Sequence, residues 1–239
     1  MSRYLEQTQL LDYNSENIQK LISEKGWKQL PIEQRVAAIY NFCRDEIKFG
    51  FNEDDSLTAS YILNAGYGQC NTKSILFMAL LRAVDVECRL HGFTIDKSLQ
   101  KGIMTGQLYE LMPQEISHTW VEAYINGKWF NFEGLILDMP YLNALQKEYS
   151  EESINFVGFG VAIEDLQNAP VSWQGDNDTY IQRAGIVQDF GLFDSPDLFF
   201  EKHAQNLCEK TKQLFANTLR HKINDNIHAI RQSKFDQVN

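Results

Sequence analysis

Cys70, His118 and Glu133 are the residues of this sequence whose types and order could support nucleophilic catalysis. A cysteine attacks a carbonyl as the thiolate, so it needs a base that takes its proton and later protonates the leaving amine. An imidazole can be this base, and a carboxylate can orient the imidazole and stabilise its charged form. The three residues predict a catalytic set with Cys70 as nucleophile, His118 as base and Glu133 as orienting group.

The sequence predicts that Cys70 begins a helix. Gly66 and Gly68 precede it and allow the chain to turn sharply. Over residues 75–84, Arg82 is the only strongly polar side chain, which is typical of a helix buried on all sides. The unpaired N–H groups at a helix N-terminus favour a thiolate and can stabilise an oxyanion. The alternative is a buried structural cysteine on a core helix.

Residues 118–133 predict a β-hairpin. Two alternating segments flank Asn-Gly at 126–127, and this pair is preferred in two-residue type I′ turns. Such a turn pairs Ile125 with Lys128.

This register decides which carboxylate reaches the histidine. It places His118 and Glu133 on the same face of the hairpin, as diagonal neighbours. Asp138 has the opposite parity and is the poorer partner, although a one-residue slip would reverse the choice.

The other segments predict an α+β fold. Apolar residues recur at helical spacing in some segments and alternate as in strands in others. The predicted helices cover residues 14–26, 31–47, 56–66, 141–149 and 195–232, and the further predicted strands cover 87–95 and 154–163. The connection 96–117 is long for a compact domain, and it is either a binding loop or a plain surface insertion.

The last predicted helix carries an apolar stripe that must be covered. Its members are Leu207, Leu214, Leu219, Ile223, Ile227 and Ile230. Packing on the body of the protein would cover it, and so would a homodimer contact. We expect a catalytic domain at 1–170 and a C-terminal extension at 171–239 packed on the same domain.

Composition narrows the function classes. The net charge of −10 argues against nucleic acid or an anionic membrane as the main partner. No segment has the roughly 20 apolar residues of a membrane helix, and the N-terminus lacks a signal-peptide core, so we expect a cytoplasmic protein. The four cysteines, Cys43, Cys70, Cys88 and Cys208, form no CxxC pair and predict neither a zinc site nor a disulfide framework. The acidic loop 174–179 lacks the spacing of a calcium site and is interpreted as a turn.

Three motifs resemble those of the transglutaminase-like superfamily, and in particular its bacterial cysteine-peptidase type. Tyr-Gly-Gln-Cys-Asn-Thr-Lys-Ser at 67–74 resembles the cysteine motif, and His-Thr-Trp-Val-Glu-Ala-Tyr at 118–124 resembles the histidine motif. Trp-Phe-Asn-Phe-Glu at 129–133 occupies the place of the third motif, whose carboxylate is usually aspartate. The resemblance covers residues 31–138.

The resemblance implies a papain-like core, in which the cysteine helix packs on an antiparallel sheet. It also implies amide chemistry through a thioester on Cys70, without a cofactor, on a protein, peptide or small amide. We expect water rather than an amine to resolve the thioester. The glutamate at 133 and the apolar tail leave open a catalytically inactive binding or assembly module, and an arylamine-type acetyltransferase is a third reading.

Overall fold

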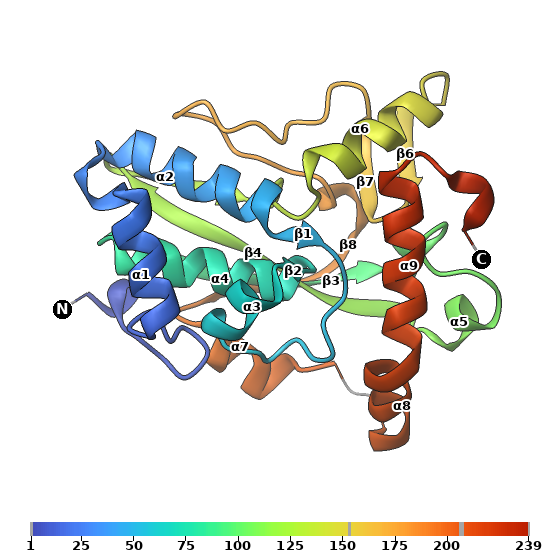
Figure 1. The fold of residues 1–239 in the computed structure, drawn as a ribbon, viewed down its shortest axis with the longest axis horizontal. Coiled ribbons are helices and arrows are strands. Elements are labelled where there is room, and N and C mark those ends of the chain that lie inside the picture. The colour runs from blue at the N-terminus through green and yellow to red at the C-terminus, as the bar shows by residue number, and fades with distance from the viewer. Residues whose placement is uncertain (1, 153, 206–207, 239) are drawn as a thin grey trace.

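The computed structural model describes residues 2–152, 154–205 and 208–238. Helices form its N-terminal part and a four-stranded antiparallel sheet follows, which confirms the predicted α+β class (Figure 1). The N-terminal helices are α1 (Glu16–Lys25), α2 (Ile32–Asn41), α3 (Ala59–Ala65) and α4 (Cys70–Ala83).

Local sequence signals set the boundaries of α1 and α3. Helix α1 ends at Gly26, which has a φ of 65°. Helix α3 begins after Thr58, whose side chain accepts a hydrogen bond from the Tyr61 N–H, and it ends at Gly66 with a φ of 72°. Glycine adopts this left-handed conformation without the steric penalty that other residues incur. Both predicted helix ends are therefore confirmed.

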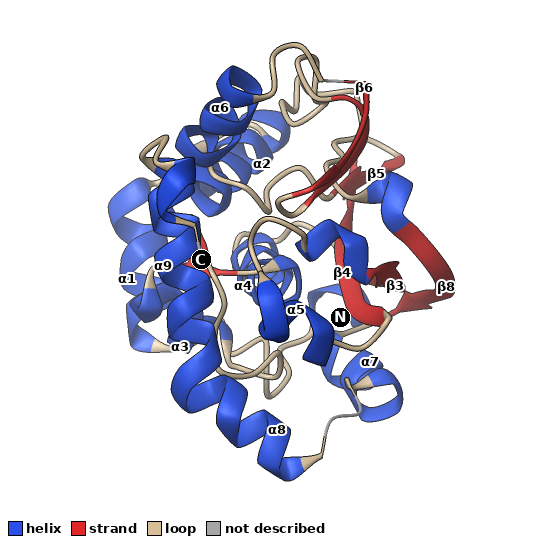
Figure 2. Ribbon diagram, turned by 90° about the vertical axis from the view of Figure 1, so that its right-hand side faces the viewer, coloured by secondary structure: helices blue, strands red, loops and turns tan. Residues whose placement is uncertain are grey.

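Helix α4 lies at the centre of the molecule. Every residue from Cys70 to Ala83 is buried. Figure 2 shows α4 between the other N-terminal helices on one side and the sheet on the other. Its buried Arg82 donates hydrogen bonds to the backbone carbonyls of Glu6, Cys88 and Asp194. The prediction of a helix buried on all sides is confirmed.

The four-stranded sheet has the order β5-β4-β3-β8, and all neighbours are antiparallel. Its strands are β3 (Cys88–Asp96), β4 (Glu115–Ile125), β5 (Lys128–Phe132) and β8 (Ile186–Phe193). The first three were expected from their alternation. Strand β8 was not, because its residues face solvent or half-buried surroundings on both sides and so do not alternate.

The hairpin of β4 and β5 has the predicted register. Both residues of the 126–127 turn have positive φ, at 49° and 88°. Ile125 pairs with Lys128, and the ladder runs outward to Phe132. Glu133 is therefore the first residue after β5, at the edge of the paired region.

One predicted strand is divided in the structure. The expected strand at 154–163 is a hairpin of β6 (Ile154–Gly158) and β7 (Val161–Asp165), with the turn at 159–160. The glycines of this segment allow the turn, since Gly158 and Gly160 both have positive φ. A further small sheet joins β1 (Lys48–Phe49) and β2 (Tyr67–Gly68), which pair in parallel.

The predicted helix at 195–232 is wrong as a single helix. It consists of α7 (Pro196–His203), α8 (Glu209–Leu214), a π-helical turn at 215–219 and α9 (Arg220–Arg231). The chain leaves the helical conformation at Ala204, which has extended backbone angles. Helix α7 packs on β3 and β8, whereas α9 packs on α6 (Met139–Glu148), so the two helices bury their apolar sides against different partners.

The tail stripe is covered in part by the protein itself. Ile223, Ile227 and Ile230 of α9 are buried in a core that also contains residues of α6. Leu214 is exposed, and Leu207 lies outside the described residues. The domain boundary at 170 and the homodimer contact stay predictions. Among the described residues, no helix is long and apolar enough to cross a membrane.

The long connection 96–117 holds a short helix. It contains a 3-10 turn at 97–100 and α5 (Gly106–Leu111) before β4 begins at Glu115. Asn226 of α9 donates a hydrogen bond to the Ile103 carbonyl, at 2.9 Å, and so ties this connection to the C-terminal helix.

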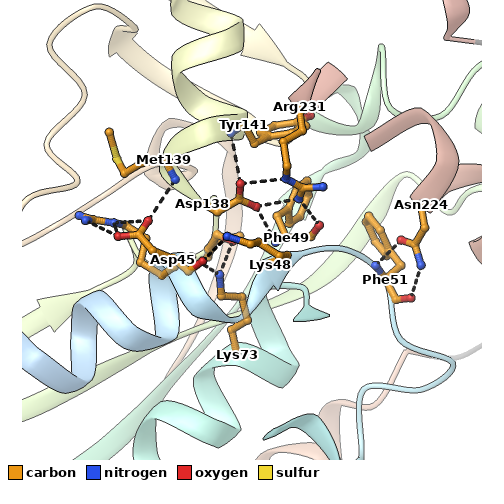
Figure 3. A network of polar contacts seen from close by, with 12 residues as sticks. Asp45, Lys48, Phe49, Phe51, Lys73, Asp138, Met139, Tyr141, Asn224 and Arg231 are labelled. Carbon is orange, nitrogen blue, oxygen red and sulfur yellow. Dashed lines mark hydrogen bonds and ion pairs between the residues drawn. The ribbon is translucent and has the colours of Figure 1, made fainter. Parts of the chain in front are cut away.

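A buried ion pair also fastens α9 to the body (Figure 3). Arg231 donates to both carboxylate oxygens of Asp138, at 2.9 and 2.7 Å, and to the Phe49 carbonyl at 2.8 Å. Asp138 also accepts hydrogen bonds from the N–H groups of Phe49 and Tyr141. Three distant segments of the chain therefore meet at one carboxylate.

We predict that Arg231→Met destabilises the protein by about 3 kcal/mol, because it leaves the Asp138 charge buried without its cation. Burial opposes ionisation, but the hydrogen bonds and charge of Arg231 lower the pKa of Asp138 below its ordinary value. The stability from this pair is thus present above about pH 4 and is lost as the pH falls further and Asp138 becomes protonated.

Urea unfolding across this pH range measures the difference between Arg231→Met and the parent. Lys234→Met is the matched control, since Lys234 is exposed. Equal stability of both variants at neutral pH would contradict the prediction.

Candidate functional site

The turn before α4 places Cys70 at the first position of the helix. Gly66 supplies a left-handed φ of 72°, and Gly68 supplies space. A Cβ on Gly68 would lie 2.6 Å from the Thr72 hydroxyl oxygen, which is closer than side chains approach. That hydroxyl accepts a hydrogen bond from the Gln69 N–H at 3.1 Å and caps the helix.

The Gln69 side chain ties the loop 52–55 to the start of α4. Its Nε2 donates to the Asp55 carboxylate at 2.8 Å, and its Oε1 accepts from the Asn52 N–H at 3.0 Å. This loop therefore forms a fixed wall next to Cys70.

The first turn of α4 is bonded to β4 on both sides of His118. Asn71 Nδ2 donates to the Ser117 carbonyl at 3.2 Å, and Asn71 Oδ1 accepts from the Thr119 hydroxyl at 3.1 Å. Ser74 adds a bond to the Thr119 carbonyl at 3.3 Å. These contacts fix the cysteine end of the helix against the strand that carries the histidine.

His118 and Glu133 contact each other directly. The Nε2 atom of His118 lies 2.7 Å from Glu133 Oε1, and both side chains are fully buried. Within the described residues, the buried Nδ1 atom of His118 has no hydrogen-bond partner. The hydrogen bond at Nε2 thus orients the imidazole, and Nδ1 is available to bind another group.

The second oxygen of Glu133 is also held. Glu133 Oε2 accepts hydrogen bonds from the N–H groups of Ile181 and Gln182, at 2.8 and 2.9 Å. These donors could not be predicted from the sequence, because every residue except proline has a backbone N–H and these two lie nearly fifty residues away. They satisfy the hydrogen-bonding capacity of a carboxylate oxygen that is buried away from water.

Asp138 does not lie in this set. Its two oxygens bind Arg231 and the N–H groups of Phe49 and Tyr141, and it caps α6. The alternative of Asp138 as partner of the histidine is therefore wrong in this structure. The hairpin keeps the predicted register, in which Glu133 is the diagonal neighbour of His118.

The environment of the Cys70 thiol differs from what the helix N-terminus alone predicts. Burial raises the pKa of Cys70 well above its ordinary value, and the carboxylates of Asp55 and Glu133 add to this effect. The N–H groups of Asn71 and Thr119 oppose it as hydrogen-bond donors to the sulfur. The balance favours the thiol, so forming the thiolate requires a base beside the sulfur.

Cys70 lies in a cleft of about 340 Å³. Its walls come from the loop 51–56, the connection 95–117 and the C-terminal segments 200–205 and 211–219. The apolar lining residues are Phe49, Phe51, Ile95, Leu108, Leu111, Met112, Pro113, Ile116, Phe200, Ala204, Leu214, Phe215 and Leu219. The connection 96–117 is thus part of the cleft wall rather than a plain surface insertion.

Lys73 is a second buried group that sequence analysis did not single out. It lies on α4, fully buried, and donates hydrogen bonds to the carbonyls of Arg44 and Ile136 at 3.1 and 3.0 Å (Figure 3). Burial lowers its pKa to about 7. Its bonds run to the network around Asp138, so it supports the fold behind the site.

The other cysteines and histidines have different surroundings. Cys43 and Cys88 are buried core residues, and Cys208 is exposed. His91 forms hydrogen bonds with Glu122 and Asp189 on the sheet. The His203 ring stacks on Phe190 with centroids 4.1 Å apart, because α7 packs on the sheet.

The acidic loop 174–179 has a structural role. Asp178 accepts hydrogen bonds from the Asn131 N–H and side chain, at 2.8 and 3.0 Å, and so extends the edge of β5. In the described part of the chain, no group of three or more His, Cys, Asp or Glu residues could hold a metal ion.

Comparisons with known proteins bear on the family. Residues 20–134 match the family model described as the Transglutaminase-like superfamily. A solved structure described as "a Putative Cysteine Protease" from Cytophaga hutchinsonii is similar at 14% identity and a TM-score of 0.47, over 81% of this chain and 47% of that one. This chain thus spans about half the length of that protein. No curated protein shows significant similarity. The segment 20–134, with Cys70, His118 and Glu133, belongs to the transglutaminase-like superfamily.

Proposed function

We propose that this chain is a cysteine enzyme that cleaves amide bonds through a thioester on Cys70. The family match supports a cysteine enzyme in general terms. The observation that carries the finer proposal is the buried contact between His118 Nε2 and Glu133, which leaves Nδ1 without a partner among the described residues. An imidazole held in this way is suited to act as a base.

In the proposed reaction, His118 Nδ1 takes the thiol proton as the Cys70 sulfur attacks the amide carbonyl. The C–S bond forms, and the carbonyl electrons move to the oxygen. The unpaired N–H groups at the start of α4 stabilise this oxyanion. The C–N bond then breaks, and the imidazolium gives its proton to the leaving amine. Glu133 stays ionised and stabilises the imidazolium.

Water resolves the thioester in our proposal. His118 takes a proton from the water as the new C–O bond forms. The C–S bond then breaks, and the imidazolium returns the proton to the sulfur as the acid product leaves. Hydrolysis is preferred over amine transfer because water is always present and needs no dedicated acceptor site. The substrate is a protein, peptide or small amide.

The pKa of Cys70 supports a second candidate function. A buried thiol with a raised pKa is also what an inactive binding module of the same fold would contain. Such a module would bind a partner and would not form a thioester. The alkylation and turnover experiments below separate the two functions.

We predict that His118→Ala slows iodoacetamide labelling of Cys70 at pH 8 by at least about tenfold, because the buried thiol loses its base. Mass spectrometry of the labelled peptides measures the rate. Cys208 in the same sample is an internal control. Its labelling rate should be the same in both proteins, since it is exposed and has no part in the proposed reaction. Equal labelling of Cys70 in both proteins would contradict the role of His118.

We predict that the pKa values of Cys70 and Cys208 are shifted in opposite directions from the ordinary value of a thiol. The side-chain hydrogen bond from Thr211, at 3.1 Å, lowers the pKa of Cys208, whereas burial raises that of Cys70. Labelling of Cys208 should therefore reach half its maximum below about pH 8.5, and labelling of Cys70 above it. Selective labelling of Cys70 below pH 7 would instead indicate a stable thiolate–imidazolium pair in the resting protein.

We predict that Glu133→Gln and Glu133→Asp both slow turnover of a peptide amide by at least about 100-fold. The glutamine keeps the length but loses the charge. The aspartate keeps the charge but is too short to reach both His118 and the N–H groups of Ile181 and Gln182. Glu115→Gln, an exposed change on β4, is the control. Full activity of Glu133→Asp would show that the second oxygen is not needed.

Products with and without an added primary amine distinguish hydrolysis from transfer. Mass analysis should find the free acid in both samples. An amide of the added amine as main product would overturn the preference for water.

A further inference from the structure

The cleft beside Cys70 has apolar side chains that face solvent. Leu111 on α5 is 62% exposed, and Leu214 on α8 is 44% exposed, although both line the same cleft. The neighbouring Leu108 and Phe215 line it as well. Exposed apolar groups on two helices that line the same cleft favour a ligand with an apolar body.

Three buried polar residues in the lining of the cleft, here called its floor, each have an atom without a hydrogen-bond partner. Gln100, Ser117 and Gln182 line the cleft, and their buried Oε1, Oγ and Oε1 atoms have no partner within the described residues. The residues are only 3–5% exposed. Gln182 Nε2 donates to the Gly160 carbonyl at 2.7 Å, and this bond fixes the side chain so that its oxygen is the free atom. Buried acceptors of this kind call for a donor.

The charges along the cleft have mainly one sign. Glu53, Asp54 and Asp55 line it, and Lys212 is the cation that lines it in the described part of the chain. Arg220, 3.9 Å away, partly balances Glu53. Burial raises the pKa of Asp55, which accepts a hydrogen bond from the neutral Gln69 amide, so the negative charge of this loop comes mainly from Glu53 and Asp54. The Asp54 carboxylate is exposed, so the cleft keeps a negative edge.

We propose that the substrate of this cleft combines an apolar body with a cationic nitrogen, as in a peptide with a bulky apolar residue next to a basic one or next to a free amino terminus. The apolar part lies between α5 and α8. The N–H groups of the ligand donate to the acceptors of the floor, and the cationic nitrogen lies along the acidic loop. This inference rests on the proposed function only in assigning the same cleft to the substrate.

Other ligand chemistries fit less well. An anionic ligand would meet the exposed carboxylate of Asp54 at the edge of the cleft. A purely apolar ligand would fill the walls but leave the buried oxygens of Gln182 and Ser117 without donors, at a cost in free energy. The cationic, donor-rich ligand satisfies both the charge and the acceptors.

The test uses Cys70→Ser protein, so that binding is measured without turnover. Isothermal titration calorimetry compares naphthylbutylamine with naphthylbutanoate, which share an apolar body and differ in charge. We expect the amine to bind at least about tenfold more tightly in low salt, with a smaller ratio in high salt. Asp54→Asn in the same background should weaken amine binding about threefold.

Asp176→Asn is the matched control, because Asp176 is exposed and does not line the cleft. Equal binding of the two probes, tighter binding of the acid, or no binding of either overturns the proposal. So does an equal effect of the two aspartate variants. Failure of the labelling and turnover experiments with a preserved amine preference would reject the enzyme and keep the binding site.

Discussion

The complete burial of α4 is the constraint on which the rest of the structure depends. A helix that is covered on every side cannot shift or rotate without disturbing the core around it. Its first turn is also bonded to the Ser117 and Thr119 carbonyls of β4, so the cysteine and the histidine strand form one rigid unit. Chemistry that needs a sulfur and an imidazole in fixed relation is compatible with such a scaffold.

Two buried carboxylates organise the regions on either side of this unit. Glu133 fixes the imidazole and is itself held by backbone N–H groups. Asp138, five residues later, binds Arg231 and joins α9 to the start of α6. In the short segment after β5, Glu133 thus binds the histidine of the candidate site, and Asp138 stabilises the fold. A turn at 134–137 separates the two residues, and Asp138 lies beyond it as the N-cap of α6.

Much of the site could be predicted because it is encoded locally. The Asn-Gly turn fixes the hairpin register, and this register brings Glu133 rather than Asp138 to His118. The run of apolar residues after Cys70 likewise encodes a buried helix. Partners from distant segments could not be predicted, such as the N–H groups of Ile181 and Gln182, since any residue has an N–H. The division of the C-terminal segment into separate helices could not be predicted for a similar reason, because its helical periodicity continues where the tertiary contacts change.

The N–H donors to Glu133 extend the candidate site beyond the segment that contains its three side chains. The family match ends at residue 134, and the expected domain boundary lies at 170, yet the glutamate is held by the backbone at 181–182. A fragment cut at either point would contain all three side chains of the set but would leave the Glu133 carboxylate without two of its three hydrogen-bond partners. The backbone at 181–182 therefore belongs to the site as much as the side chains of the matched segment do.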